Sequence, residues 1–262
     1  MLTPYYETEL GKLYHGDCLD IMPALPPVDL VVTSPPYDEL RKYNGYRFDA
    51  GATIGQLSRI VAPGGVCVWV VADATVDGSE TCTSFRQAIA FRAAGWWLYD
   101  TMIWKKTCVA APSPGRYYNA FEYMFVFSKG RPKTINLIND RINITGGSQR
   151  SPSKHFEKEG RQAGGKSYKV GRRGRRYNVW RIGPSNHVTG HPAVFPLRLP
   201  KDHIVSWSNS GDTVLDPMSG SGTTLLAAEQ LGRQWIGVEV SEKYCEIAAK
   251  RIEAEARQLK LF

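Results

Sequence analysis

The C-terminal part of the sequence constrains the fold most, because strand and helix patterns alternate there around a glycine-rich turn. A strand is expected to end at Thr213–Leu215, a helix to follow at Gly222–Leu231, and a second strand at Trp235–Val240. Ser241 is a suitable N-cap for a last helix that runs to about Gln258. This order of elements is the β-α-β unit of an α/β, doubly wound and mostly parallel sheet.

The N-terminal half shows the same kind of organisation. Its apolar runs are rich in β-branched residues and do not alternate with polar ones, which suits strands covered on both faces. Helical patterns cover Ile54–Ala62 and Ser84–Ala94. The strands expected here are Val28–Thr33, Val66–Ala72, Trp96–Trp104 and Glu122–Ser128. The last two should form an antiparallel hairpin at the sheet edge, since no helical pattern separates them.

Positive charge is concentrated in one window of the chain. The whole chain has 33 Lys and Arg against 25 Asp and Glu, a net charge of +8, but residues 129–176 alone hold 14 basic and three acidic residues. This window therefore carries +11 and the rest of the chain −3. Its Gly-, Ser- and Asn-rich composition cannot bury a core alone. It is either an insertion that orders on a partner, a flexible basic arm or a solvated loop without a partner.

The charge pattern divides the chain into three regions: residues 1–130, a basic inserted region at 131–190, and residues 191–262. Basic residues interleaved with Phe156, Tyr168 and Tyr177 are typical of a surface that faces nucleic acid. Ordinary apolar content, 42%, excludes a wholly disordered chain.

Several classes of site are disfavoured. The five cysteines are scattered without a C-x-x-C pair, so neither a disulfide framework nor a zinc site is expected, and no metal is predicted. The longest apolar run, Val66–Ala72, is too short to span a bilayer, and the start of the sequence lacks a signal pattern. We expect a soluble, cytoplasmic protein, associated with the nucleoid through DNA.

The glycine-rich turn reads Asp216-Pro-Met-Ser-Gly-Ser-Gly-Thr-Thr224. Its two glycines allow the backbone to turn sharply and to approach a ligand. The turn lacks the G-K-[ST] ending of a phosphate loop, and Leu225 stands where a dehydrogenase would have a third glycine. Glu239, at the end of the next strand, is placed to bind ribose hydroxyls. The pattern indicates an adenosine-bearing cofactor; a plain helix N-terminus with a surface glutamate is the alternative.

A second motif, Ser34-Pro35-Pro36-Tyr37, directly follows a predicted strand. Its prolines make a stiff turn that presents carbonyl oxygens and one hydroxyl. The exocyclic amino group of a nucleobase is a poor nucleophile unless acceptors bind its two hydrogens. Ser34 and the carbonyl of Pro35 can supply those acceptors, and Tyr37 can stack on an extruded base. Taken alone, the motif could also be an ordinary rigid loop.

Together these motifs make the sequence resemble the beta-class DNA amino-methyltransferases, which transfer a methyl group from S-adenosylmethionine (SAM) to N4 of cytosine or N6 of adenine. The family's [SDN]-P-P-[YF] motif matches Ser34–Tyr37, and its D-P-x-x-G-x-G-T-T loop matches Asp216–Thr224. Catalytic loop first, basic insertion next and cofactor loop last is the order of that class. Phe121-Glu122-Tyr123 resembles the family's base-pocket segment.

The resemblance implies a circularly permuted, Rossmann-like SAM-methyltransferase sheet with residues 131–190 as an inserted target-recognition region. It implies that Ser34, Pro35, Pro36 and Tyr37 are catalytic. It assigns SAM binding to Asp17, Thr33, His191, Phe195, Asp216, Met218, Ser219, Gly220, Gly222, Thr223 and Glu239. DNA contacts are expected from Lys166, Lys169, Arg172, Arg173, Arg175 and Arg176.

The target base is suggested by Ser34. Adenine enzymes of the family mostly have Asp at this position, so Ser34 favours cytosine N4, with adenine N6 as the alternative. An RNA or protein amino-methyltransferase would be expected to have its cofactor loop first, and a non-catalytic DNA-binding protein would need neither motif. The expected partner is double-stranded DNA, with a possible restriction endonuclease beside it, and the chain is expected to be a monomer or a homodimer.

Overall fold

The computed structural model describes residues 2–36, 48–109, 111–112, 114–150, 167–183 and 196–259. The chain divides into two compact units. Unit 1 comprises Met1–Asn136 and Asn178–Phe262, and unit 2 comprises Leu137–Tyr177. Within the described residues, no helix is both long and apolar enough to cross a membrane.

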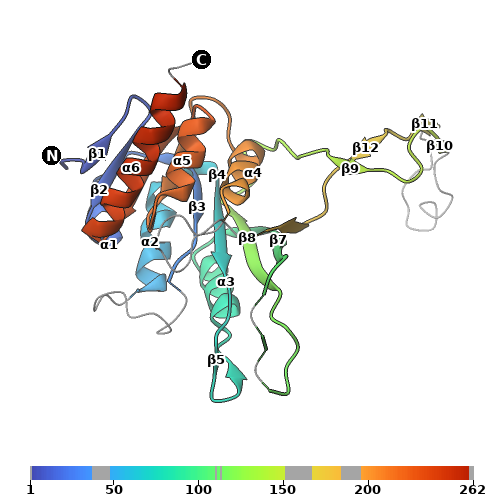
Figure 1. Cartoon of the computed structure of the whole chain (residues 1–262), viewed down its shortest axis with the longest axis horizontal. Coiled ribbons are helices and arrows are strands. Elements are labelled where there is room, and N and C mark those ends of the chain that lie inside the picture. Colours follow the sequence, from blue (N-terminus) through green and yellow to red (C-terminus); the bar gives the residue numbers. More distant parts are fainter. Residues whose placement is uncertain are drawn as a thin grey trace. The chain divides into compact units, whose positions relative to one another are not determined.

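Unit 1 is built on a nine-stranded sheet, as counted over the described residues (Figure 1). In spatial order its strands are β1 (Tyr6–Glu7), β2 (Gly11–His15), β15 (Gln234–Glu239), β14 (Thr213–Asp216), β3 (Val28–Thr33), β4 (Val61–Val71), β8 (Phe121–Ser128), β7 (Trp97–Lys106) and β13 (Val179–Ile182). In this sheet β1 is antiparallel to β2, and β8 is antiparallel to both β4 and β7; the other described neighbours are parallel. The predicted mostly parallel sheet is confirmed, and so is the antiparallel pairing of β7 with β8.

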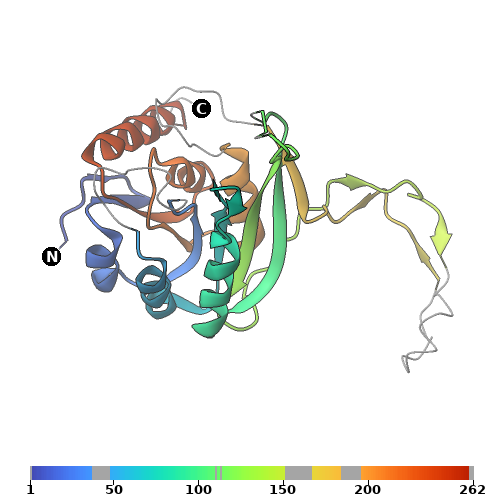
Figure 2. The ribbon, with the colours of Figure 1, turned by 90° about the horizontal axis from the view of Figure 1, so that it is seen from below.

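Helices cover both faces of this sheet (Figure 2). One face packs against α1 (Cys18–Ile21), the 3-10 helix η1 (Met22–Ala24), α2 (Ala50–Ile60) and α3 (Thr83–Ala93). The other face packs against α4 (Arg198–Trp207), α5 (Thr223–Gln230) and α6 (Glu242–Leu259). The central strand β4 shows why its sequence does not alternate with polar residues: Val68 and Val70 enter one core, and Trp69 and Val71 enter the other.

The sequence did not predict every element of unit 1. It left out α4, and Val179–Ile182 falls in the window assigned to the inserted region. In the structure this stretch is β13, which pairs in parallel with β7 and lies outside the hairpin at the end of the sheet. A short hairpin, β5 (Thr75–Val76) and β6 (Ser79–Glu80), follows β4. Arg116, from the β7–β8 loop, forms an ion pair with Glu80 of this hairpin.

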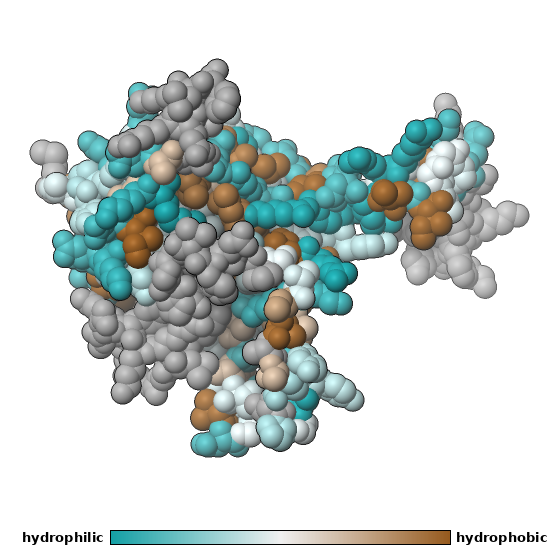
Figure 3. All heavy atoms as spheres, in the orientation of Figure 1, coloured by the Kyte–Doolittle hydropathy of each residue, from teal (hydrophilic) through white to brown (hydrophobic). Residues whose placement is uncertain are grey.

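Unit 2 consists of two short antiparallel strand pairs. β9 (Arg141–Ile142) pairs with β12 (Arg173–Gly174), and β10 (Gln149–Arg150) pairs with β11 (Tyr168–Lys169). Its residues are largely exposed, and its visible face is mostly hydrophilic with isolated apolar groups (Figure 3). Within this unit, the Arg176 guanidinium binds both carboxylate oxygens of Asp140, and Arg141 lies over the ring of Tyr177.

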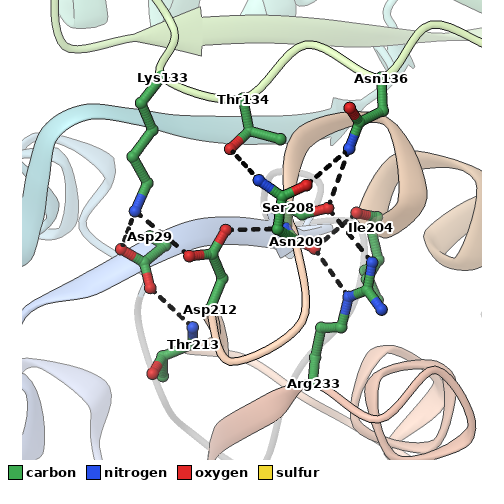
Figure 4. A network of polar contacts seen from close by, with 10 residues as sticks. All are labelled: Asp29, Lys133, Thr134, Asn136, Ile204, Ser208, Asn209, Asp212, Thr213 and Arg233. Atoms are coloured by element: carbon green, nitrogen blue, oxygen red, sulfur yellow. Dashed lines mark hydrogen bonds and ion pairs between the residues drawn. The ribbon is translucent and has the colours of Figure 1, made fainter.

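A polar network holds the chain that follows β8 against the amino ends of β3 and β14 (Figure 4). The Lys133 ammonium contacts Asp29 at 2.6 Å and Asp212 at 3.3 Å. The second oxygen of Asp29 accepts the Thr213 N–H at 2.7 Å. We call this cluster the amino-edge network; its acids are neutralised by a lysine of the same unit.

Candidate cofactor and catalytic site

The carboxyl ends of four neighbouring strands form the candidate site. β2, β15, β14 and β3 are parallel and adjacent, so the residues that follow them meet at one edge of the sheet. Those residues include Asp17, Glu239, Asp216 and Ser34, which lie far apart in the sequence. A crevice at this edge is the usual ligand position in open α/β sheets.

Thr33 and Asp216 join the two sequence motifs. The Thr33 hydroxyl donates a 2.7 Å hydrogen bond to Asp216 Oδ1, and both residues are buried. The Met218 N–H also reaches Asp216 Oδ1, at 3.2 Å. Thr33 directly precedes Ser34, so this bond fixes the start of the serine-proline loop to the start of the glycine-rich turn. Thr33 was predicted to bind cofactor; its hydroxyl here holds the Asp216 carboxylate.

Burial dominates the electrostatics of Asp216. Desolvation raises the pKa of its carboxyl from 3.8 to about 6, and the hydrogen bonds from Thr33, Thr224 and Met218 only partly offset that effect. Since ionisation in this position is costly, a cationic group placed beside Asp216 would be favoured.

Glu239 lies at the end of β15 and is also buried. Its Oε2 accepts the Gly220 N–H at 2.7 Å and its Oε1 accepts the Ser241 N–H at 2.9 Å. Burial raises the pKa of this carboxyl, against the lowering effect of those N–H groups. Each oxygen keeps a second lone pair, which can accept a hydrogen bond from a ribose hydroxyl.

The turn after β14 requires its glycines. Gly220 and Gly222 have φ of +53° and +77°, where L side chains are strained. A Cβ on Gly222 would also lie 2.7 Å from the Cβ of Ala248 in α6. The Arg251 guanidinium, also from α6, donates to Ser221 O and, at 3.2 Å, to Thr223 Oγ1. Contacts with α6, the helix that follows β15, therefore hold the turn in place.

Asp17 lies at the end of β2. The Gly16 N–H donates to Glu239 O at 2.9 Å, so the residues after β2 and β15 are adjacent. Asp17 Oδ1 accepts the Leu19 N–H at 2.8 Å and caps α1. If Asp17 also binds an adenine amino group, as predicted, it would do so while capping α1.

The catalytic motif is described in part. Pro35 is buried, while Ser34 and Pro36 are half-buried. On the next strands at the same edge, Tyr123 stacks on Phe125 with ring centroids 5.1 Å apart and meets the half-exposed ring of Phe85 edge-on. Burial raises the pKa of the Tyr123 hydroxyl, and the negative charge of the nearby Asp73 raises it further. Four predicted site residues lie outside the described residues: Tyr37, Lys166, His191 and Phe195.

The predicted DNA-contacting residues that the structure describes all lie in unit 2. Lys169, Arg172, Arg173 and Arg175 are exposed, whereas Arg176 is half-buried on Asp140. Arg176 thus contributes to the folding of unit 2 itself.

The acids at the carboxyl edge suit SAM. A sulfonium, an ammonium, ribose hydroxyls and an adenine amino group are all cations or hydrogen-bond donors, and Asp17, Asp216 and Glu239 supply acceptors or negative charge at one edge. Within the described residues, no group of three or more His, Cys, Asp or Glu side chains is arranged to hold a metal ion.

Sequence reasoning missed two features of this region. Arg251 fixes the glycine-rich turn but belongs to a helix with no motif. Lys106, at the end of β7, forms a 2.6 Å ion pair with the buried Glu122 of β8. Glu122 was part of the predicted base-pocket segment, but its partner could be recognised only from the register of the hairpin.

Known proteins are similar to this chain over nearly its full length. Residues 28–250 match the family model N6_N4_Mtase, described as DNA methylase. Orphan methyltransferase M.BamHII of Bacillus amyloliquefaciens is 47% identical over 247 residues, which is 90% of this chain and 90% of that protein. PvuII DNA methyltransferase (cytosine-N4-specific) has a TM-score of 0.70 and 24% identity, covering 95% of this chain and 89% of its own. The M1.HpyAVI–SAM complex has a TM-score of 0.64 and 23% identity, covering 92% and 98%.

Proposed function

Because this chain belongs to the N6/N4 DNA methylase family, we propose that it methylates N4 of cytosine in double-stranded DNA. The chain is a DNA amino-methyltransferase, and SAM is its cofactor. The choice of cytosine over adenine and the roles of individual residues are the substance of the proposal. One observation carries these roles: the buried Thr33–Asp216 hydrogen bond, which places the serine-proline loop beside the glycine-rich turn.

The SAM-holding residues follow from the donors and acceptors at the carboxyl edge. Glu239 accepts hydrogen bonds from the ribose hydroxyls, and Asp17 accepts one from the adenine amino group. Asp216 and the turn from Gly220 to Thr223 hold the methionine end, where the ionised Asp216 attracts positive charge. When bound, SAM supplies the methyl group as an activated sulfonium. The predicted contributions of Met218, Ser219, His191 and Phe195 belong to the same proposal.

Ser34 and the Pro35 carbonyl prepare the nucleophile. They accept hydrogen bonds from the two N–H groups of the target amino group, so that the nitrogen lone pair is no longer fully delocalised into the ring. Tyr37 stacks on the base after it leaves the duplex. After methyl transfer the amino nitrogen carries a positive charge, which it loses by releasing one proton to water. Alignment of the two reactants and exclusion of water supply much of the rate.

The target base rests on Ser34. The PvuII enzyme, named as cytosine-N4-specific, supports the fold at 24% identity and leaves the base to be argued from the motif. Adenine N6 is the second candidate, since the amino chemistry is the same.

The proposed function is tested with Ser34→Ala combined with Tyr37→Ala. We expect base methylation to fall at least a hundredfold, in line with the loss of transition-state hydrogen bonds, while SAM still stabilises the protein in a thermal shift assay. Ser210→Ala, an exposed serine next to the amino-edge network, is the matched control. Sequencing of modified bases in DNA from expressing cells identifies the base. Unchanged methylation in the double variant would contradict the catalytic assignment. If N6-methyladenine is the only modified base found, the choice of cytosine is wrong.

The basic window is proposed to hold the DNA backbone. Changing Arg172, Arg173 and Arg175 to Gln should weaken DNA binding and reduce the slope of log affinity against log salt by up to about 3, with SAM affinity unchanged. Arg176 is left in place because its pair with Asp140 supports unit 2. An unchanged slope would place the phosphate contacts elsewhere.

A restriction endonuclease partner stays a prediction. M.BamHII is named an orphan methyltransferase, so a relative of this kind need not have one. Protection of cellular DNA from a nuclease encoded beside this chain would identify such a partner.

A further inference from the structure

An ion pair lies at the same edge of the sheet as the serine-proline loop. Lys106 Nζ contacts Glu122 Oε1 at 2.6 Å, with side chains 31% and 8% exposed. The ammonium also lies 5.5 Å from the ring centroid of Trp104, which is itself buried. The acid is thus nearly removed from solvent, while the lysine retains an open side.

The strand register relates this pair to Ser34. Thr33 is paired with Trp69 of β4, and Trp69 with Phe125 of β8, so Ser34 starts about level with the residues just before Phe125. Glu122 therefore lies two strand spacings, about 10 Å, across the sheet from the catalytic loop and two residues, about 7 Å, further along the strand direction, a separation that the side chains must bridge. Lys106 reaches Glu122 from β7. A pyrimidine ring with one hydrogen bond at each end spans a similar distance.

Stability alone does not account for the pair. Taking two charges out of water costs about as much as their attraction returns, and apolar pairs at such positions are often as stable. The neighbouring Trp104, Met124, Trp180 and Ile182 form an apolar core into which such a pair would fit. A half-open lysine on a buried acid instead resembles a hydrogen-bond donor that is held in place for a ligand.

We propose that Lys106, held by Glu122, reads the target base by donating a hydrogen bond to O2 of cytosine. This inference rests on the proposed cytosine-N4 function and adds a specificity residue to it. With the amino group held by Ser34 and Pro35, the ring atom two positions along carries O2 in cytosine and a C–H in adenine. A donor at this point favours cytosine, because adenine would offer no acceptor to the N–H that faces the base, while Glu122 binds only another N–H of the same ammonium.

Glu122 has a separate part in this arrangement. The base gains positive charge as its amino nitrogen accepts the methyl group, and a bare ammonium nearby would oppose that charge. The Glu122 carboxylate offsets the lysine, so that the base receives a hydrogen bond with little net positive charge. Lys106 is therefore a specificity residue, and Glu122 is a positioning residue that acts through it.

The test compares Lys106→Met, Lys106→Arg, Glu122→Gln and the double variant Lys106→Met/Glu122→Gln. Lys105→Met is the matched control, since Lys105 is exposed on the other side of the same strand. Substrates are duplexes that carry the sequence modified by the wild-type protein, with cytosine or adenine at the target position. The readouts are kcat and KM for each base, SAM affinity and Tm.

We expect Lys106→Met to lower the ratio of kcat/KM for cytosine over adenine roughly tenfold to hundredfold, with SAM affinity unchanged. Lys106→Arg should restore part of the preference, and Glu122→Gln should lower kcat more than it raises KM. If Lys106→Met fails to fold because the buried Glu122 loses its cation, the neutral double variant shows whether the base preference depends on Lys106. A folded double variant with the wild-type base preference would overturn the inference. A wild-type protein that modifies only adenine would overturn the cytosine proposal itself, before any variant is made.

Discussion

The two edges of the central sheet hold their acidic side chains in opposite ways. At the amino edge, Asp29 and Asp212 share Lys133, and the hydrogen bond to Asp29 raises the pKa of that lysine. At the carboxyl edge, burial raises the pKa of Asp216 and of Glu239, and neither pairs with Lys or Arg among the described residues. Their hydrogen bonds come from hydroxyl and backbone N–H groups.

The difference supports our proposal that the acids of the carboxyl edge hold a ligand, whereas those of the amino edge stabilise the fold. At the amino edge the charges are balanced within the fold and stabilise it. At the carboxyl edge neither acid forms an ion pair with a Lys or Arg of the described residues, so burial of their negative charge costs stability. A site of this kind gains its compensation when a cationic ligand binds. SAM, the cofactor of this family, carries such charge at its methionine end.

The largest effect should come from neutralising the carboxyl edge. Asp216→Asn keeps the acceptor for Thr33 but removes the charge, so SAM affinity should fall roughly tenfold to hundredfold, the range for a lost charged hydrogen bond. The apo protein should become more stable, because a desolvated carboxyl is gone. Calorimetric titration with SAM and thermal melts measure both effects.

Asp212→Asn is the matched control at the amino edge. It should lower Tm and leave SAM affinity as in the wild type, since Asp212 is balanced by Lys133. Equal SAM affinity in Asp216→Asn and wild-type protein would contradict the distinction between the two edges.

The second effect is a pH dependence of the carboxyl edge, which follows from the raised pKa of Asp216. Asp216 has a folded pKa of about 6, above its ordinary 3.8, so its contribution to apo stability is complete below about pH 4 and is lost as pH rises through 6. SAM affinity should change in the opposite sense, rising about tenfold between pH 5 and 7 as the carboxylate ionises.

Melting and SAM titration across this pH range measure the two trends, with Asp216→Asn as the reference. Thr33→Val should move the midpoint to higher pH, because the Thr33 hydroxyl favours the ionised form. If the wild-type and Asp216→Asn profiles run parallel, another group controls SAM binding.

Much of this comparison could be predicted from the sequence at the carboxyl edge and little of it at the amino edge. Buried strands such as β3 and β4 are evident from unbroken apolar runs, and the glycines that follow β14 mark a turn with positive φ. The Thr33–Asp216 bond joins residues 183 positions apart, so only the strand order reveals it. The Ser34 motif could be recognised because it is local, and its catalytic role stays a prediction.

Other elements gave too little local signal. The helix α4 contains Pro200 and three charged residues, Arg198, Lys201 and Asp202, ahead of Ile204, which hides its periodicity. β13 is only four residues long and lies within the basic window, where composition indicates a loop. Lys133 was counted in the positive charge of residues 129–176, yet it binds Asp29 and Asp212. Charge counting cannot separate a cation that faces a ligand from one that is paired inside the fold.

Lys133 gives the smallest expected effect and the sharpest control for the amino edge. Lys133→Met leaves Asp29 and Asp212 without their shared cation, but the side chain is 40% exposed, so water screens much of the loss. We expect unfolding free energy to fall by about 0.5–1 kcal/mol, the range for a partly exposed pair. Denaturant unfolding measures it, and the difference from wild type should shrink at high salt. SAM affinity and the salt slope of DNA binding should both stay at wild-type values. A reduced salt slope in this variant would mean that Lys133 contacts DNA, and the amino edge would then no longer be purely structural.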